Sequence, residues 1–336
     1  MLDQFGEPPI LAGSGPLCNA RAAYNSHMSK EYLERDLALY GPDQTREVPM
    51  GLEQAHAYCR QLAARHYENF TVASFLMPRH LRQHFCNLYA YCRWADDLAD
   101  EIQPREKALA LLDWWEKELN SLFQPDKTGV KARHPVFLAL AGTIPEFDLP
   151  RQPLADLLIA FRQDQAKTRY ETFAELLHYC QNSANPVGRL VLYLGRCHSG
   201  ETARLSDSIC TGLQLANFWQ DVARDFQHGR IYLPQEDLLR FGYPDEEFST
   251  RTATNSFRDL LTFEVDRAEQ FLREGAPLVR RVSQDLRLPV RLFLEGGLAI
   301  IAAIRRQRYD VWSRRPTVGK GTRLWLVAKA LLWRNS

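Results

Sequence analysis

The sequence predicts an all-α fold, and three observations support this prediction. From about Leu52 onward, apolar residues recur three and four positions apart, as at Leu81, Phe85, Leu88 and Cys92, which is the spacing of one helix face. Strand-like alternation is scarce, and the Asn-Gly and Asp-Gly pairs that mark hairpins are absent from the sequence. Prolines and glycines fall between the periodic segments. We therefore predict a single helical domain with a central cavity.

Each predicted helix is a periodic segment that ends at a break. Pro78 precedes the helix that carries the first acidic motif, Pro104 follows it, and Gly229 follows the longest helix, while Pro186 suits a first turn. In chain order, the predicted helices span residues 53–68, 80–101, 105–123, 135–141, 150–166, 171–183, 186–197, 202–227, 255–275 and 289–310. A short helix is also predicted near 29–40, and a last one at 322–334.

The two ends of the chain differ from the middle. Residues 1–50 are rich in proline and glycine, so we predict a loosely ordered N-terminal extension, followed by the helical domain at residues 51–310. Residues 311–336 contain no acidic residue and six basic ones among leucines and tryptophans. This pattern predicts a basic amphipathic segment that either lies on an anionic membrane or packs on the protein's own surface.

The composition excludes several classes of protein. The 336 residues are 45% hydrophobic and 25% charged with a formal net charge of +1, which is typical of a globular protein without a bias toward nucleic acid. Residues 1–30 lack a basic start followed by an apolar run, and the charge-free stretch Gly296–Ile304 is too short to span a bilayer.

Seven cysteines form no CxxC pair, which suits reduced thiols in a cytoplasmic protein. The HExxH, Walker and GxSxG motifs are absent.

A first group of polar residues lies on one face of the predicted helix 80–101. Tyr89, Arg93, Asp96 and Asp100 follow one another at helical spacing. Like charges four residues apart destabilise a helix by roughly 0.2–0.5 kcal/mol, so the two aspartates indicate a bound cation, and Arg93 suits a phosphate. The neighbouring Asp97 is expected behind these ligands or in solvent. The alternative is a solvated acidic patch at a helix C-terminus.

A second group lies on the predicted helix 202–227. Gln214, Asn217, Asp221 and Asp225 form a ladder of oxygen-bearing side chains, and an apolar helix seldom carries such a ladder without a function. Carboxylate and amide oxygens suit Mg²⁺, which commonly bridges protein carboxylates to substrate phosphates. Nearby side chains able to bind phosphate or form ion pairs are Arg224, Arg230 and Tyr232. The alternative is a solvated face.

Together these motifs resemble those of the squalene/phytoene synthase family, the trans-isoprenoid head-to-head synthases. The resemblance covers roughly residues 56–309. It is carried by the DxxxD of Asp96 and Asp100 within YCRWADDLAD, and by the NxxxDxxxD of Asn217, Asp221 and Asp225 followed by GRIYLP. The segments 68–78, 182–192 and 217–225 are most similar to the hydroxysqualene synthases of the hopanoid pathway, which convert presqualene diphosphate to hydroxysqualene.

The resemblance implies an isoprenoid synthase fold and a set of site residues. The implied Mg²⁺ ligands are Asp96, Asp100, Asn217, Asp221 and Asp225. Catalytic roles are implied for Arg93, Tyr89, Tyr179, Arg230 and Tyr232. Substrate contacts near the diphosphate or the prenyl chain are implied for His66, Tyr67, Asn69, Phe70, Val187, Gly188, Gln214 and Gln220. For Phe70, Tyr179, Val187 and Gly188 the alternative is ordinary core packing.

The expected reaction is Mg²⁺-dependent ionisation of presqualene diphosphate, with release of diphosphate and capture of the carbocation by water. Several Mg²⁺ ions are expected and NADPH is not. The base that activates the water stays open between Tyr179 and a carboxylate of either motif. One alternative is a two-step squalene, phytoene or dehydrosqualene synthase that condenses two prenyl diphosphates; others are a non-catalytic assembly protein of the same fold and a purely structural helical scaffold. We expect no nucleic-acid partner, and an upstream presqualene diphosphate synthase.

Overall fold

The computed structural model describes residues 31–44, 50–65, 77–124 and 133–319. The chain divides after Gln165 into two compact units. The all-α prediction is confirmed, since the regular elements within these ranges are helices and the β-structure there is an isolated bridge between Arg169 and Ile231. The division into residues 1–50, 51–310 and 311–336 stays a prediction. Much of the N-terminal extension and the last predicted helix lie outside the described residues.

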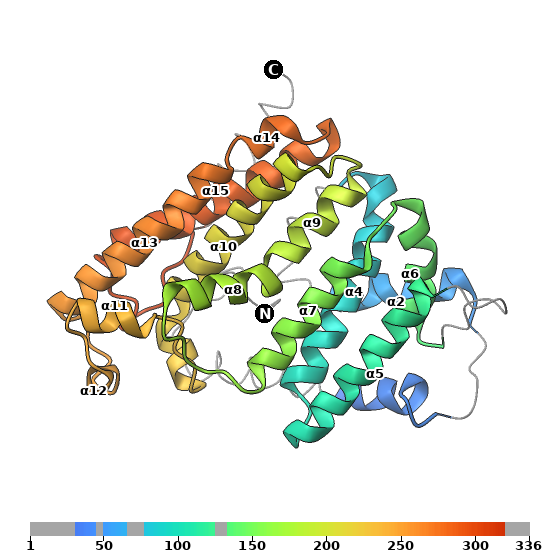
Figure 1. The fold of residues 1–336 in the computed structure, drawn as a ribbon, viewed down its shortest axis with the longest axis horizontal. Helices are drawn as coiled ribbons and strands as arrows, with labels where there is room; N and C mark the ends of the chain where they lie inside the picture. The colour runs from blue at the N-terminus through green and yellow to red at the C-terminus, as the bar shows by residue number, and fades with distance from the viewer. Residues whose placement is uncertain (1–30, 45–49, 66–76, 125–132, 320–336) are drawn as a thin grey trace. The chain divides into compact units, whose positions relative to one another are not determined.

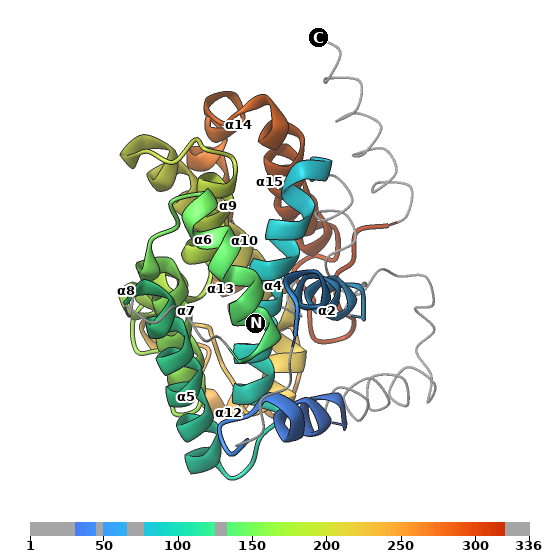
Figure 2. The ribbon, with the colours of Figure 1, turned by 90° about the vertical axis from the view of Figure 1, so that its right-hand side faces the viewer.

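The first unit is built around one long helix, α4 (Arg79–Asp100). Against it pack α2 (Leu52–Arg65), α5 (Arg105–Phe123), α6 (Pro135–Glu146) and α7 (Arg151–Asp164), and Figures 1 and 2 both show α2 lying against α4. Pro78 and Pro104 occupy the N-cap positions of α4 and α5, as their places in the sequence predict. Residues 31–40 form a further helix.

An aromatic cluster around His134 fills part of the first unit's core. His134 caps α6 by accepting a hydrogen bond from the Val136 backbone N–H at its Nδ1 atom, 3.2 Å away. The rings of Trp94 and Trp115 lie 4.5 and 4.8 Å from the imidazole, both edge to face. Burial holds the pKa of His134 well below its usual range. This neutral histidine therefore fixes the start of α6 and packs on the rings around α4.

The second unit is built around α10 (Gly200–Gln227). Its partners are α8 (Phe173–Ser183), α9 (Asn185–Leu194), α13 (Asn255–Gly275), α14 (Leu278–Arg281) and α15 (Gln284–Arg306). In Figure 1, α10 lies between α9 on one side and α13 and α15 on the other. A capping box starts α10, with the Ser199 side chain bonded to the Thr202 N–H and the Thr202 side chain bonded to the Ser199 N–H.

Several helix boundaries differ from the prediction. Helix α6 continues to Glu146 rather than ending at 141, because Gly142 stays helical and the next turn buries Thr143 and Ile144. Helix α15 begins at Gln284 and ends at Arg306, so Pro289 lies inside it. The short helices α11 (Gln235–Arg240), α12 (Asp245–Phe248) and α14 were not predicted, since four to six residues show no measurable helical period.

Within the residues that the structure describes, no helix combines the length and apolar character that crossing a bilayer requires. Cys92 and Cys180 are both buried and outside disulfides, and desolvation raises the pKa of the Cys92 thiol to about 12. Neither thiol is therefore ionised at neutral pH.

Candidate active site

The first acidic group lies at the C-terminal half of α4. Tyr89, Arg93 and Asp96 are buried, and Asp100 is exposed at the last residue of the helix. The guanidinium of Arg93 lies 3.6 Å from the Asp96 carboxylate, three residues on. The predicted face is therefore continuous along the helix, with its outermost carboxylate in solvent.

Of the two positions predicted for Asp97, behind the ligands or in solvent, the structure rules out the position in solvent. It is buried, and it forms an ion pair with Arg93, one turn earlier on α4. Burial raises the pKa of Asp97 to about 7, although the charge of Arg93 opposes this shift. Arg93 is thus held between Asp96 and Asp97, and its predicted contact with phosphate stays a prediction.

The second acidic group lies on the C-terminal half of α10. Gln214, Asn217 and Asp221 are buried and Asp225 is half-buried. The Oδ1 atom of Asn217 and the Nε2 atom of Gln214 are buried without a hydrogen-bond partner within the described part of the chain. A buried polar atom without a partner costs roughly 1–3 kcal/mol. A bound cation would satisfy the Asn217 oxygen, so this donor set fits a hard metal ion.

On the same face of α10, the negative charge of Asp225 is unfavourable without a bound cation. Its pKa is raised to about 7, first by burial and then by the charge of Asp221, one turn earlier, while Arg224 and Arg230 oppose the shift. A doubly charged cation between these carboxylates would remove the cause of their repulsion. Among the described residues, no three His, Cys, Asp or Glu side chains are arranged around a common metal position, and the α10 set consists of one amide and two carboxylates. The five predicted metal ligands therefore stay a prediction.

Arg315 is a site residue that the sequence did not single out. Its guanidinium grips the Asp221 carboxylate with two bonds, Nε to Oδ1 at 2.5 Å and Nη2 to Oδ2 at 2.9 Å, and it lies 3.2 Å from the Gln220 side-chain oxygen. Residues 94 positions apart meet here. In the sequence, Arg315 belongs to the basic segment predicted for a membrane or a protein surface, and no local pattern distinguishes it from Arg314.

The GRIYLP segment returns along α10 because of its glycine. Gly229 has φ of +74°, a left-handed conformation that favours glycine. Its N–H bonds to the Phe226 carbonyl, and the Arg230 N–H bonds to the Asp225 carbonyl, which together form a Schellman motif. The chain then runs beside residues 168–170, with the Ile231 N–H bonded to the Thr168 carbonyl.

This return brings Tyr232 onto the aromatic side chains of the second unit. The rings of Tyr232 and Phe218 are stacked at 3.8 Å, and Tyr179 lies 6.2 Å from each of them. Tyr170, which was not predicted, stacks on Tyr232 at 5.8 Å. The structure thus joins the predicted residues Tyr179 and Tyr232 in one buried aromatic cluster, with ring faces able to stabilise a nearby cation.

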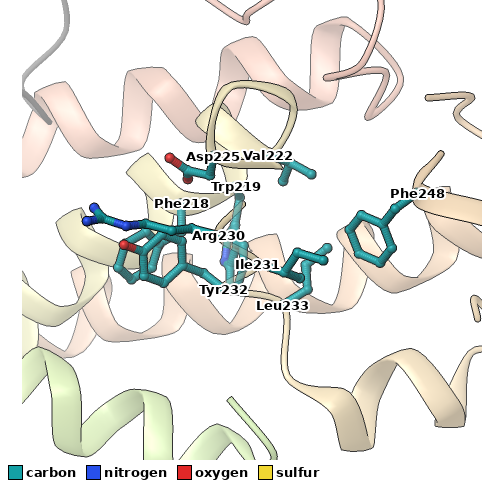
Figure 3. Close-up of a pocket in the computed structure, with 9 residues that line it drawn as sticks. All are labelled: Phe218, Trp219, Val222, Asp225, Arg230, Ile231, Tyr232, Leu233 and Phe248. Carbon is teal, nitrogen blue, oxygen red and sulfur yellow. The ribbon is translucent and has the colours of Figure 1, made fainter. Parts of the chain in front are cut away.

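A small pocket opens beside this cluster. Figure 3 shows the Arg230 guanidinium and the Tyr232 hydroxyl pointing to the same side of it, with the Asp225 carboxylate close to the α10 end. Even with the open solvent at its mouth included, its empty space is about 210 Å³, below the roughly 300–1,000 Å³ of a typical ligand site. This pocket alone therefore accommodates only part of a long substrate. It is lined by Phe218, Trp219, Val222, Asp225, Arg230, Ile231, Tyr232, Leu233 and Phe248.

Two predicted pocket residues lie where α9 crosses α10. Gly188 allows the close approach, because a Cβ atom there would lie 2.4 Å from the Ser206 Oγ and 2.5 Å from the Cys210 Sγ. Val187, its neighbour on α9, is half-buried. The packing role that the sequence offered as an alternative for Gly188 is thus observed. The predicted substrate residues His66, Tyr67, Asn69 and Phe70 lie outside the described residues.

Comparison with known proteins places the chain among known enzymes. The family model described as squalene/phytoene synthase matches residues 41–322. A 15-cis-phytoene synthase of Synechococcus elongatus is 30% identical over 84% of this chain and 94% of its own, and phytoene synthase 1 of Zea mays is 32% identical over 82% and 67%. The crystal structure of squalene synthase HpnC from Alicyclobacillus acidocaldarius is 45% identical, with a TM-score of 0.73 over 78% of this chain and 97% of that one.

A dehydrosqualene synthase solved with a ligand is 25% identical, with a TM-score of 0.74 over 84% of this chain and 98% of that one. These matches extend across both acidic motifs, and they agree with the all-α architecture and the oxygen-rich faces of α4 and α10. The chain belongs to the squalene/phytoene synthase family, whose enzymes act on prenyl diphosphates in isoprenoid biosynthesis.

Proposed function

We propose that this enzyme converts presqualene diphosphate to hydroxysqualene. In this reaction the C–O bond to diphosphate breaks, a bond from carbon to a water oxygen forms, and the water loses a proton. The observation that carries the proposal is the α10 face, where Asn217 Oδ1 has no partner among the described residues and Asp225 is ionised only with difficulty. Both features suit a face that binds Mg²⁺ and, through it, a diphosphate.

The residues of the chain have separate roles in this proposal. The family resemblance implies that Asn217, Asp221 and Asp225 on α10, and Asp96 and Asp100 on α4, would be the Mg²⁺ ligands. The metal would neutralise charge that develops on the departing diphosphate. Arg93 and Arg230 would add hydrogen bonds to its oxygens. The clustered rings of Tyr179, Phe218 and Tyr232 would present apolar, electron-rich faces to the carbocation and keep bulk water away.

Two similarities favour different products. The 45% identity to a squalene synthase HpnC structure exceeds the 30–32% identity to the phytoene synthases, and this supports the squalene branch of the family, to which the sequence resemblance assigns hydroxysqualene formation. The matches to phytoene synthases support the second candidate, a two-step enzyme that condenses two prenyl diphosphates and finishes by loss of a proton. Both candidates use the same ionisation step, so the choice depends on the substrate accepted and on how the cation is quenched.

The test supplies the purified full chain with one substrate at a time and Mg²⁺, without NADPH, and identifies products by gas chromatography and mass spectrometry. With presqualene diphosphate we expect hydroxysqualene, and with farnesyl diphosphate alone we expect no consumption. Phytoene from geranylgeranyl diphosphate, or dehydrosqualene from farnesyl diphosphate, would establish the two-step alternative instead. Turnover of none of these substrates would favour a non-catalytic protein, and Asp225→Asn serves as the inactive control.

A further inference from the structure

The chain after α15 forms a strap along the second unit. This strap, residues 307–319, begins with a turn in which the Gln307 side chain bonds to the carbonyls of Asp310 and Arg314. The Asp310 carboxylate accepts hydrogen bonds from both the backbone N–H and the hydroxyl of Ser313. These bonds give the start of the strap a defined backbone geometry.

Trp312 anchors the strap to the second unit. Its buried ring lies 5.9 Å from the rings of Phe226 and Phe248 and 5.6 Å from that of Phe257. Phe226 belongs to the last turn of α10, directly after Asp225. The anchor therefore sets where the following residues meet α10.

Beyond this anchor the strap meets the α10 acidic face at two points. Arg315 engages both oxygens of Asp221, and the Gln220 side-chain N–H donates to the Pro316 carbonyl at 2.5 Å. Gln220 also lies 3.2 Å from Arg315 through its oxygen. The buried Gln220 amide thus binds the backbone of the strap, and the Asp221 carboxylate binds the charged side chain of Arg315.

Arg315 and a metal ion would compete for the carboxylate of Asp221. The guanidinium already binds both carboxylate oxygens, and a divalent cation at the same carboxylate would face its positive charge at short range. We propose that the strap is a latch: Arg315 neutralises Asp221 in the metal-free enzyme, and Mg²⁺ binding on α10 displaces the Arg315 side chain and loosens residues 315–319. This inference rests on the proposed function, because it requires the α10 face to bind Mg²⁺.

Displacement of Arg315 should loosen only the later part of the strap. Trp312 is held by apolar rings that Mg²⁺ does not touch, so residues 311–312 stay in place when Arg315 is displaced. Arg315 also bonds to the Gln220 oxygen, so its displacement frees the amide that holds Pro316. Pro316 and Val318 then lose order. The Asp221 carboxylate would therefore stay paired with Arg315 until a divalent cation binds on α10.

The first test measures Mg²⁺ binding to the full chain by isothermal titration calorimetry, without any substrate. Arg315→Gln removes the competing cation, so we expect Mg²⁺ to bind about tenfold more tightly, the size of a charged hydrogen-bonded pair. Arg315→Lys keeps the charge but loses the two-pronged geometry, and we expect an intermediate affinity. Arg314→Gln is the matched control, since it makes the same charge change at an exposed neighbouring side chain.

The second test follows hydrogen–deuterium exchange of the strap in the same proteins. Mg²⁺ should speed exchange at residues 317–319 of the natural chain and leave residues 311–312 unchanged, while Arg315→Gln should exchange quickly at 317–319 with or without Mg²⁺. If Arg315→Gln and Arg314→Gln bind Mg²⁺ equally well, or if Mg²⁺ slows exchange at 317–319, the latch is wrong.

Failure of the latch is distinguishable from failure of the metal site. Asp225→Asn leaves the Arg315–Asp221 contact intact but removes a predicted metal ligand. Loss of Mg²⁺ binding in Asp225→Asn, together with equal affinities in the two arginine variants, would keep the proposed metal site and reject the latch. Unchanged Mg²⁺ binding in Asp225→Asn would reject the α10 metal site and the latch with it.

Discussion

Ionisation of Asp225 is opposed both by burial and by the charge of Asp221 on the turn before it. A carboxylate kept in such a position destabilises the folded chain unless a cation compensates for it. The spacing of the two aspartates is visible in the sequence, whereas the depth of their burial is not. A carboxylate at position 225 therefore favours metal binding but lowers the stability of the metal-free folded chain.

The Asp225→Asn variant should therefore gain stability and lose affinity for Mg²⁺. In the absence of Mg²⁺ at pH 8, we expect the free energy of unfolding to rise by about 1 kcal/mol, because a repelled carboxylate becomes a neutral amide. Mg²⁺ affinity should fall at least about tenfold. Urea titration and calorimetry measure the two effects. Glu201→Gln, an exposed carboxylate on the same helix, should change neither; a destabilised Asp225→Asn would refute the electrostatic account.

Glu264 provides a second buried carboxylate, away from the α10 acidic face. It shares Arg267 with Asp237, with the guanidinium 3.3 Å from Glu264 and 2.6 Å from Asp237. The Arg267 guanidinium thus forms ion pairs with two buried carboxylates. Desolvation raises the pKa of Glu264 well above its usual range, and the charge of Asp237 adds to the shift, while Arg267 opposes it.

This arrangement predicts that stability falls as pH rises. Below the unfolded-state pKa of about 4.5 the Glu264 carboxyl is protonated in both states; above it the unfolded chain releases the proton while the folded chain keeps it. The folded state then binds more protons, so its stability decreases with pH. Glu264→Gln should flatten the decline, gaining on the order of 1–3 kcal/mol at pH 8 relative to pH 5. Urea unfolding at both pH values tests this, with exposed Glu274→Gln as the control; an unchanged slope would refute it.

At the scale of elements, helix periodicity placed most of the helices correctly. Residues 105–123 and 255–275 match α5 and α13 at both ends, and the breaks at Pro78, Pro104 and Gly229 lie where the sequence predicts them. The missed elements are one or two turns long, and their formation depends on neighbouring packing rather than on local pattern. How closely two helices approach is likewise a property of the pair, as the α9–α10 crossing shows.

Gly188→Ala should weaken that crossing. The new methyl group would meet Ser206 Oγ at 2.4 Å and Cys210 Sγ at 2.5 Å, so we expect a loss of roughly 1–3 kcal/mol in the free energy of unfolding. Adding Ser206→Ala and Cys210→Ala should recover part of it. Gly142→Ala is the control, because that helical glycine has open space around its Cβ position and alanine there should stabilise by about 0.5–1 kcal/mol. Equal effects at the two glycines would contradict the packing argument.

At the scale of the whole molecule, metal and diphosphate binding should be visible as stability. Anything that binds the folded chain and not the unfolded one raises its melting temperature. Mg²⁺ together with inorganic diphosphate should stabilise the protein by about 2–3 kcal/mol at a hundredfold excess over the dissociation constant, and EDTA should reverse the gain. Differential scanning calorimetry measures this. Diphosphate that stabilises equally in EDTA would show that the anion binds without the metal.

The sequence by itself determined the helical architecture, the two acidic motifs and the family. The architecture and the motifs depend on spacing along a single helix, where positions three and four apart share a face whatever packs against them, and the family follows from the resemblance of those motifs. It also located Tyr179 and Tyr232, although it did not predict that Phe218 and Tyr170 would join them in one cluster.

Only the tertiary structure decided which partners these residues have. Asp97 proved buried against Arg93, and Asp221 proved to be held by Arg315 from 94 positions away. Burial and ion pairing depend on distant segments that the fold brings together, and a local pattern carries no information about them. The acidic ladder of α10 was therefore predictable from the sequence, but the cation that holds it was not.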